Sequence, residues 1–283
     1  MSIIITADST CDLSEELIKK HGIIITPLYV NYDDKSFKDG VDVKPAQIFE
    51  YVQNTKKLPK TAAVTVADYT DVFSKIISDG NSVIHINISS DFSASHQNAV
   101  IASKEVEGDI HIVDSRNLST GSGHTVLKAA ELAEKGMSAE EITSFLNNEY
   151  IPKVNASFCI DTLTYLHKGG RCSTVAALGA NLLKIKPCIE VVQGKMNVGK
   201  KYRGKLDNVL KQYVEDRLGD TNNIDTTRIF ITHTGCSKEM IDGVIKEINR
   251  HCKFKEVIET TAGCTISNHC GPGTLGILYL NNN

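Results

Sequence analysis

Short runs of β-branched residues alternate with segments of helical periodicity through the first half of the chain. Ile3 to Thr6, Ser82 to Ile88 and Ile110 to Val113 are such runs, and helix-period segments lie between them. This alternation is typical of βαβ units around a parallel sheet. Because ligands of such sheets bind beyond the carboxyl ends of the strands, the residues that follow each strand are candidate site residues.

The second half of the chain has a different pattern, and the change falls near Pro152. Six strand candidates follow, and two of them flank Gln193-Gly194, a pair that indicates a hairpin and hence an at least partly antiparallel sheet. Helices are predicted over Thr174 to Leu183, Lys205 to Leu218 and Lys238 to Cys252.

Together these patterns predict an α/β protein of two domains. A chain of 283 residues is near the length at which one core divides into two. We expect a Rossmann-like parallel-sheet domain over residues 1–152 and a domain with a mixed, six-stranded sheet and helices over residues 153–283. A ligand cleft is expected between them.

Several local signals predict where elements begin and turn. Asp12 with Glu15, and Ser138 with Glu141, have the spacing of helix capping boxes. Ile23 to Val30 is predicted to be a strand. The stretch from Tyr29 to Phe37 alternates and turns at an acidic pair, which indicates a hairpin.

Charge and hydropathy exclude several classes of partner. The chain has 31 lysines and arginines against 34 aspartates and glutamates, a formal net charge of −3, so we expect no nucleic-acid partner. No apolar stretch reaches the roughly 18–20 residues of a membrane span, and the N-terminus has no basic start typical of a signal peptide. We therefore expect a cytoplasmic protein with no integral membrane segment.

The eight cysteines are scattered along the chain, and none form a C-x-x-C pair. Free thiols are expected, which agrees with a cytoplasmic location. No metal site and no cofactor are predicted.

Two polar segments follow predicted strands in the first half. Asp8 stands after the first strand, and Ser90 and Ser93 stand between a strand and a helix. Hydroxyl groups at a helix start could hold an anion such as a carboxylate or a phosphate. The alternatives are a hydrogen-bonded turn at Asp8 and simple helix capping by a serine. A nucleophilic serine is a further alternative, but the G-x-S-x-G pattern is absent.

Two further segments lie in the second half. His269 precedes Cys270-Gly271-Pro272-Gly273, which formally begins a G-x-G-x-x-G pattern, but no helix follows it and a dinucleotide site is not predicted. The glycines instead indicate a tight loop with His269 at its mouth, where the histidine has either a structural or a ligand-binding role. Lys168-Gly169-Gly170-Arg171 is a basic loop, read as a solvated turn or as a contact for an anion or a partner.

In order and spacing these segments resemble the DegV family of two-domain bacterial proteins, which bind a fatty acid. The resemblance covers essentially the whole chain. Its motifs are Asp8-Ser9-Thr10 with Asp12-Leu13, Thr61 after Lys57-Leu58-Pro59-Lys60, Ser89-Ser90 with Ser93, Gly169-Gly170-Arg171, Arg203, and His269 with Gly271-Pro272-Gly273-Thr274.

The resemblance implies a lipid carrier with no catalytic residues of its own. A long-chain fatty acid such as palmitate would lie in a buried interdomain tunnel, and its carboxylate would meet Thr61 and Ser93. His269, Ser90 and Asp8 are candidates for residues that support Thr61 and Ser93 without binding the carboxylate themselves. A separate fatty acid kinase would dock on the carrier and convert the bound carboxylate to an acyl phosphate, and we expect Arg171 and Arg203 to contact it.

The chain departs from the family pattern beside both head-group residues. Thr61 is followed by Ala62-Ala63-Val64 where the family commonly has Ser-Gln-Pro, and Ser93 is followed by Ala94-Ser95 in place of Gly-Thr. The polar support beside Thr61 is therefore expected to differ.

The energetics permit a carrier. Burial of about 15 methylenes at roughly 0.8 kcal/mol each contributes on the order of 12 kcal/mol before the cost of ordering the chain. The carboxylate needs hydrogen-bond partners, which two hydroxyl groups near a helix start can supply.

Two other functions stay open from the residues alone. A phosphotransferase or hydrolase using Ser93, His269 and Asp8 predicts turnover by the purified protein, whereas a carrier predicts none without its partner. A protein–protein adaptor predicts no extractable ligand.

Overall fold

The computed structural model describes residues 2–176 and 185–283. The chain divides into two compact units. Unit 1 comprises Met1–Lys44 and Lys60–Pro152, and unit 2 comprises Pro45–Pro59 and Lys153–Asn283. We propose that these units are the two domains expected from the sequence, with Pro45–Pro59 contributed by the first half of the chain to the second domain.

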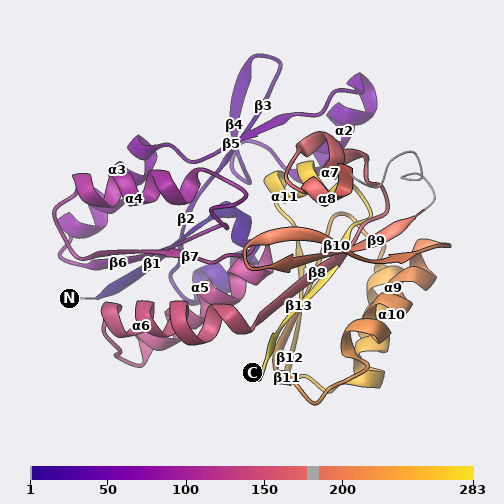
Figure 1. Cartoon of the computed structure of the whole chain (residues 1–283). Helices are drawn as coiled ribbons and strands as arrows, with labels where there is room; N and C mark the ends of the chain where they lie inside the picture. Colours follow the sequence, from indigo (N-terminus) through magenta and orange to yellow (C-terminus); the bar gives the residue numbers. More distant parts are fainter. Residues whose placement is uncertain (1, 177–184) are drawn as a thin grey trace. The chain divides into compact units, whose positions relative to one another are not determined.

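Unit 1 is built on a parallel four-stranded sheet in the order β2-β1-β6-β7, as the alternating pattern predicts. Helices α3 and α4 cover one face of this sheet, and α5 and α6 cover the other (Figure 1). The central strand β6 is buried at all six positions, which is typical of a parallel sheet covered on both faces. The elements are β1 (Ile3–Asp8), β2 (Ile24–Thr26), β6 (Ser82–Asn87), β7 (Ile110–Asp114), α3 (Val66–Ser78), α4 (Ser95–Glu105), α5 (Thr120–Glu134) and α6 (Ala139–Phe145).

The α3 side of the sheet contains a compact apolar cluster. Tyr69 and Phe73 of α3 are fully buried, and their rings are stacked with centroids 5.7 Å apart. They pack with Val83 of β6 and with Ala99 and Ala102 of α4. This packing fixes the start of α4 against α3, which positions the loop between β6 and α4.

The strand predicted from Ile23 to Val30 is divided between two sheets. It contains β2 and the start of β3 (Tyr29–Tyr32), with Pro27 between them, a residue that cannot donate to a strand ladder. β3 forms the predicted hairpin with β4 (Lys35–Lys38), and Asp33 and Asp34 at its turn have φ values of 49° and 58°. The strand β5 (Lys60–Ala62), which the sequence did not reveal, completes a three-stranded sheet.

One of the two predicted capping boxes is wrong. Helix α1 (Glu15–Lys20) is capped by Ser14, whose Oγ accepts from the N–H of Leu17 at 3.3 Å. Asp12 instead has a left-handed backbone and accepts from the Ser119 hydroxyl at 2.6 Å. The box at Ser138 and Glu141 is confirmed at the start of α6. Unit 1 also contains η1 (Ser9–Cys11) and η2 (Leu146–Tyr150), and η3 (Ile151–Lys153) lies where the chain passes from unit 1 to unit 2.

Unit 2 contains the expected mixed sheet of six strands, in the order β10-β9-β8-β13-β11-β12. Every neighbouring pair is antiparallel except β11 with β12. The hairpin at Gln193-Gly194 is confirmed, and both turn residues have positive φ. The strands are β8 (Val154–Cys159), β9 (Lys186–Val192), β10 (Lys195–Tyr202), β11 (Ile224–His233), β12 (Glu256–Thr261) and β13 (Leu275–Asn281).

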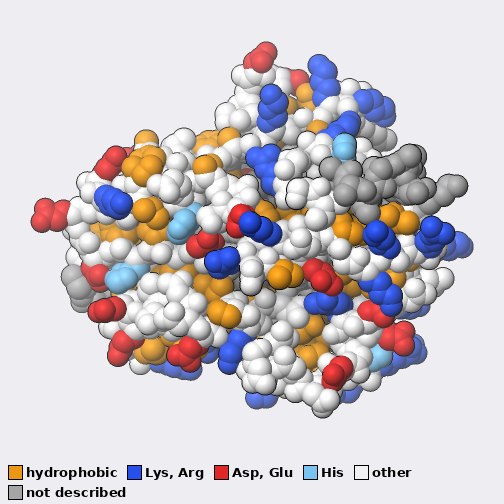
Figure 2. Space-filling view, viewed as in Figure 1, with side chains coloured by type: hydrophobic (Ala, Val, Ile, Leu, Met, Phe, Trp, Pro, Cys, Tyr) orange, Lys and Arg blue, Asp and Glu red, His pale blue; other side chains and the backbone are white. Residues whose placement is uncertain are grey.

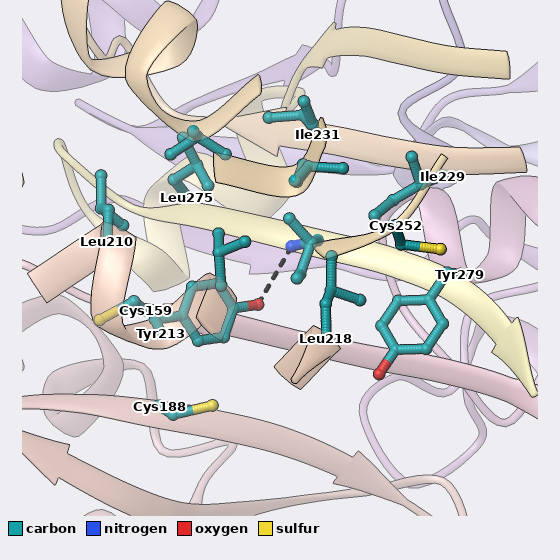
Figure 3. Close-up of a cluster of buried hydrophobic side chains, with 14 of the residues drawn as sticks. Cys159, Cys188, Leu210, Tyr213, Leu218, Ile229, Ile231, Cys252, Leu275 and Tyr279 are labelled. Carbon is teal, nitrogen blue, oxygen red and sulfur yellow. Dashed lines mark hydrogen bonds between the residues drawn. The ribbon is translucent and has the colours of Figure 1, made fainter. Parts of the chain in front are cut away.

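Helices α9 (Leu206–Leu218) and α10 (Lys238–His251) close the main core of unit 2. Tyr213 of α9 lies at its centre, fully buried (Figure 3). Its phenol donates to the carbonyl of Ser157 at 2.7 Å and accepts from the N–H of Ile277 at 3.1 Å. The core therefore buries this polar group with its hydrogen bonds satisfied.

The described part of unit 2 also contains four short helices: α2 (Pro45–Thr55), α7 (Thr164–Gly169), α8 (Ser173–Ala176) and α11 (Cys264–Cys270). Phe49 of α2 meets Tyr165 of α7 edge to face, with ring centroids 6.2 Å apart. Asn268 of α11 donates to the carbonyl of Pro59 at 3.0 Å. The sequence patterns revealed neither α7 nor α11. Of the helix predicted over Thr174 to Leu183, the structure describes α8 (Ser173–Ala176), and the rest lies outside the described residues.

Across residues 2–176 and 185–283, no helix is long and apolar enough to cross a membrane. On the face shown in Figure 2, basic and acidic side chains are interspersed.

Candidate functional site

The sequence-predicted site residues are divided between the two units. Asp8, Thr61, Ser90 and Ser93 belong to unit 1, and Arg171, Arg203 and His269 belong to unit 2. Each group is described within its own unit.

Ser93 lies in a tight loop between β6 and α4. The loop is held by two backbone hydrogen bonds, from Ser89 N–H to the carbonyl of Asn117 at 2.8 Å and from Phe92 N–H to the carbonyl of Ser89 at 2.9 Å. The side chain of Phe92 is buried beneath it. Ser93 is half-buried and accepts from the N–H of Ser95 at 3.2 Å. Ala94 stands directly before α4 and makes no side-chain cap, and the Ser93 hydroxyl instead satisfies the N–H of Ser95 in the first turn of the helix, as the capping alternative expects.

Ser95 connects this loop to the chain that follows Thr61. Its Oγ lies 2.9 Å from the Oγ of Ser93 and accepts from the N–H of Val64 at 3.3 Å. The carbonyl of Val64 accepts from Asn98 at 2.7 Å. Thr61 lies three residues before Val64, in β5 and opposite Val30. The segment that follows Thr61 is therefore held to α4 through the backbone of Val64 and not through a polar side chain at positions 62 to 64.

Asp8 is almost fully buried at the end of β1 and accepts several hydrogen bonds. Tyr69 Oη donates to it at 2.5 Å, the N–H of Ile88 at 3.0 Å and Asn87 Nδ2 at 3.2 Å. His85 Nε2 lies 3.4 Å from the carboxylate. Asp8 is thus the centre of a buried polar cluster, not an exposed base.

Tyr69 links this cluster to the Ser93 loop. Its pKa is raised well above the usual value, mainly by burial and by the charge of Asp8, while a hydrogen bond from Ser95 opposes that effect. Asn87 also donates to Tyr69 Oη, at 3.0 Å. Sequence reasoning missed Tyr69, because on the buried face of a helix it is indistinguishable from a core aromatic residue.

Ser90 points away from Ser93. It is exposed, and its hydroxyl donates to Asp114 of β7 at 2.6 Å.

His269 lies at the end of α11 against the Gly169-Gly170-Arg171 loop. A side chain at Gly169 would collide with its imidazole, which explains the glycine there. Burial, and then the charge of Arg171, lower the pKa of His269 to about 4. At neutral pH the ring is therefore uncharged, and it can donate or accept one hydrogen bond at each nitrogen.

Arg171 and Arg203 are both exposed. The guanidinium of Arg171 donates to the carbonyl of Gly169 at 2.8 Å. Arg203 follows β10 directly, at the start of the turn that leads into α9.

The cysteines are free thiols. Burial raises the pKa of Cys11 and of Cys188 to about 12 in each case, so neither is a thiolate nucleophile at neutral pH. Among the described residues, no group of three or more histidine, cysteine, aspartate or glutamate side chains could hold a metal ion.

Sequence comparisons connect the chain to one family. A family model described as an uncharacterised protein of the DegV family matches residues 2–282. A DegV domain-containing protein of Clostridium acetobutylicum is 35% identical over 281 residues, covering 98% of this chain and 97% of the relative. One of Caldanaerobacter subterraneus subsp. tengcongensis is 33% identical over 279 residues, covering 98% of both chains.

Solved structures agree. A fatty-acid-binding DegV family protein from Thermus thermophilus has a TM-score of 0.92 at 26% identity, covering 99% of this chain and 100% of that chain. A stearic-acid-binding protein from Eubacterium ventriosum has a TM-score of 0.87 at 27% identity, covering 100% of this chain and 99% of that chain. With its separate parallel and mixed sheets and its match to the family model over nearly all its residues, this chain belongs to the DegV family.

Proposed function

We propose that this protein is a cytoplasmic carrier that binds a long-chain fatty acid and presents its carboxyl group to a separate fatty acid kinase for conversion to an acyl phosphate. The observation that carries the proposal is the match over 99% of the chain to a DegV protein that binds fatty acids. The acyl chain occupies the buried tunnel that the family resemblance implies, and burial of its methylenes supplies the affinity. The free thiols agree with a reducing cytoplasm.

Thr61 and Ser93 hold the carboxyl group in this proposal. Two hydrogen bonds support their assignment: the chain after Thr61 is joined to the first turn of α4, directly after the Ser93 loop, through the contacts of Val64 with Ser95 and Asn98. A hydroxyl group on a loop held by such bonds is positioned before the ligand arrives, which reduces the cost of ordering on binding. His269, Ser90 and Asp8 do not hold the carboxyl group directly. Arg171 and Arg203 contact the kinase.

The enzyme alternative receives no support from the surroundings of Ser93. Its hydroxyl contacts Ser95, and among the described residues no histidine or carboxylate hydrogen-bonds to it. A nucleophilic serine needs an adjacent base.

Two measurements test the proposal: the identity of the bound ligand and the rate at which it is phosphorylated. Native mass spectrometry of the purified protein is expected to detect a bound long-chain fatty acid, and the protein alone is expected to turn nothing over. Thr61→Ala and Ser93→Ala are expected to retain most of the lipid, because the tail supplies the affinity. Acyl phosphate formation with added fatty acid kinase and ATP should fall at least tenfold, since the head group is misplaced.

Ser103→Ala is the matched control, because Ser103 is also half-buried in unit 1 but donates only to the carbonyl of Val100 in its own helix. Undiminished phosphorylation in both head-group variants would refute the assigned roles. A protein with no bound lipid and no capacity to take it up would refute the carrier.

A further inference from the structure

Two hydroxyl groups, those of Tyr69 and Ser95, connect the buried Asp8 carboxylate to Ser93 in a hydrogen-bonded chain. Tyr69 Oη donates to Asp8 at 2.5 Å, Ser95 hydrogen-bonds to Tyr69, and the Oγ atoms of Ser95 and Ser93 are 2.9 Å apart. Asp8, Tyr69 and Ser95 are at most 1% exposed, whereas Ser93 is half-buried. The chain therefore runs from the interior of unit 1 to the proposed head-group residue.

Asp8 determines which group is the donor in each hydrogen bond of this chain. Tyr69, Asn87, Thr26 and the N–H of Ile88 all donate to it, so the carboxyl group is the acceptor in each of these hydrogen bonds. The other titratable groups that face the cluster include two histidines and Cys11, whose pKa is raised mainly by burial and also by the charge of Asp8. His85 lies 3.4 Å from Asp8, and His96 contacts the side-chain oxygen of Asn87.

Each hydroxyl has a single proton, and counting them gives one arrangement. Tyr69 donates its hydroxyl proton to Asp8. In the hydrogen bond between Tyr69 and Ser95, the donor must therefore be Ser95. The bond between Ser95 and Ser93 must then use the proton of Ser93. Both serines also accept a backbone N–H, from Val64 at 3.3 Å for Ser95 and from Ser95 itself at 3.2 Å for Ser93. Ser93 is left with a lone pair to offer to a ligand, but no proton.

We propose that Asp8, acting through Tyr69 and Ser95, makes Ser93 a hydrogen-bond acceptor, so that the site takes its fatty acid in the protonated form. This inference rests on the proposed function. A neutral carboxyl group has one O–H donor and one carbonyl acceptor: Ser93 accepts from the first and the Thr61 hydroxyl donates to the second. Asp8, Tyr69 and Ser95 are positioning residues, since each acts on the ligand only through Ser93.

The test measures the protonation of the bound ligand directly. The protein is loaded with [1-¹³C]palmitic acid, and the carboxyl ¹³C chemical shift is followed against pH. In the wild-type protein the apparent pKa of the bound acid is expected to lie above that of the same acid in water.

Two variants interrupt the chain at different points. Ser95→Ala frees the proton of Ser93, and Tyr69→Phe allows Ser95 to donate to Ser93. In both variants Ser93 can donate to a carboxylate, so the apparent pKa of the bound acid should fall by about 1, the tenfold change expected for one hydrogen bond to a charged group.

Ser122→Ala is the matched control: Ser122 is a buried serine of unit 1 whose hydroxyl lies 2.8 Å from that of Ser115. This variant should keep the wild-type pKa of the bound acid. An acid that binds but titrates as in water in the wild-type protein, or that titrates identically in wild type, Ser95→Ala and Tyr69→Phe, overturns the inference alone. Absence of any bound acid in the wild-type protein overturns the proposed function and this inference with it.

Discussion

At the scale of single residues, the two exposed arginines of unit 2 differ in how firmly they are held. Arg171 donates to the carbonyl of Gly169 at 2.8 Å, which fixes its guanidinium beside His269. Within the part of the chain that the structure describes, the Arg203 side chain makes no hydrogen bond or ion pair, and its position directly after β10 fixes only its backbone. A guanidinium that is already ordered loses less conformational freedom on docking.

Arg171→Ala and Arg203→Ala are therefore both expected to weaken binding of the kinase, Arg171→Ala more strongly. Each lost contact with a carboxylate should reduce affinity by about tenfold, which calorimetric titration with the kinase would measure. Arg250→Ala is a suitable control, because Arg250 is an exposed arginine of α10 that pairs with Glu247 of its own helix. Kinase affinity equal to wild type in both variants would show that this surface does not dock the partner.

At the scale of elements, the start of α6 is determined by residues that are close together in the sequence. The Ser138 hydroxyl accepts from the N–H of Glu141 at 3.3 Å, and the Glu141 carboxylate accepts from the N–H of Ser138 at 2.9 Å. Both partners lie within one helical turn, so the motif is complete without any contribution from the rest of the chain.

Ser138→Ala is expected to lower the free energy of unfolding by about 1 kcal/mol, because the first turn of α6 loses an acceptor. Urea denaturation followed by circular dichroism would measure it. Ser144→Ala, at an exposed position inside the same helix, should leave stability unchanged or slightly higher, since alanine has the better helix propensity. Equal stability of Ser138→Ala and wild type would show that α6 does not depend on this box.

Contacts between residues far apart in the sequence explain the predictions that were wrong or missing. Asp12 and Glu15 have capping-box spacing, yet Asp12 accepts from Ser119, which lies 107 residues later, and Ser14 caps the helix instead. Helices α7 and α11 are short and lack helical periodicity, so only their packing in unit 2 stabilises them. The hydroxyl groups that follow strands could be predicted from position alone. Their connection through Tyr69 could not, because it depends on how α3 packs against β6.

At the scale of the whole molecule, buried histidines make stability depend on pH. Burial, followed by the charge of Arg171, lowers the pKa of His269 from 6.5 to about 4, and burial lowers the pKa of His233. A histidine whose pKa is lower in the folded state binds its proton more readily when unfolded. Stability is therefore complete above about pH 6.5 and is lost as the pH falls toward 4.

His269→Gln is expected to reduce this loss. Between pH 6.5 and 4 the free energy of unfolding of the lipid-free wild-type protein should fall more steeply than that of the variant, by at most about 1.4 kcal/mol per pH unit. Urea titrations at several pH values would measure both slopes, and the carboxyl groups common to both proteins cancel in the difference. Parallel curves for the two proteins would show that His269 is protonated as readily in the folded state as in the unfolded one.

Pro45–Pro59 belongs to unit 2 although it is synthesised within the first half of the chain, and this affects folding on the ribosome. Asn268, which holds the carbonyl of Pro59, is translated 209 residues after it. At roughly 5–20 residues per second, that interval is on the order of 10–40 s. Until α7 and α11 have been synthesised, α2 lacks helices against which it packs in unit 2, so its apolar side chains, Phe49 among them, are uncovered in the nascent polypeptide and open to a chaperone.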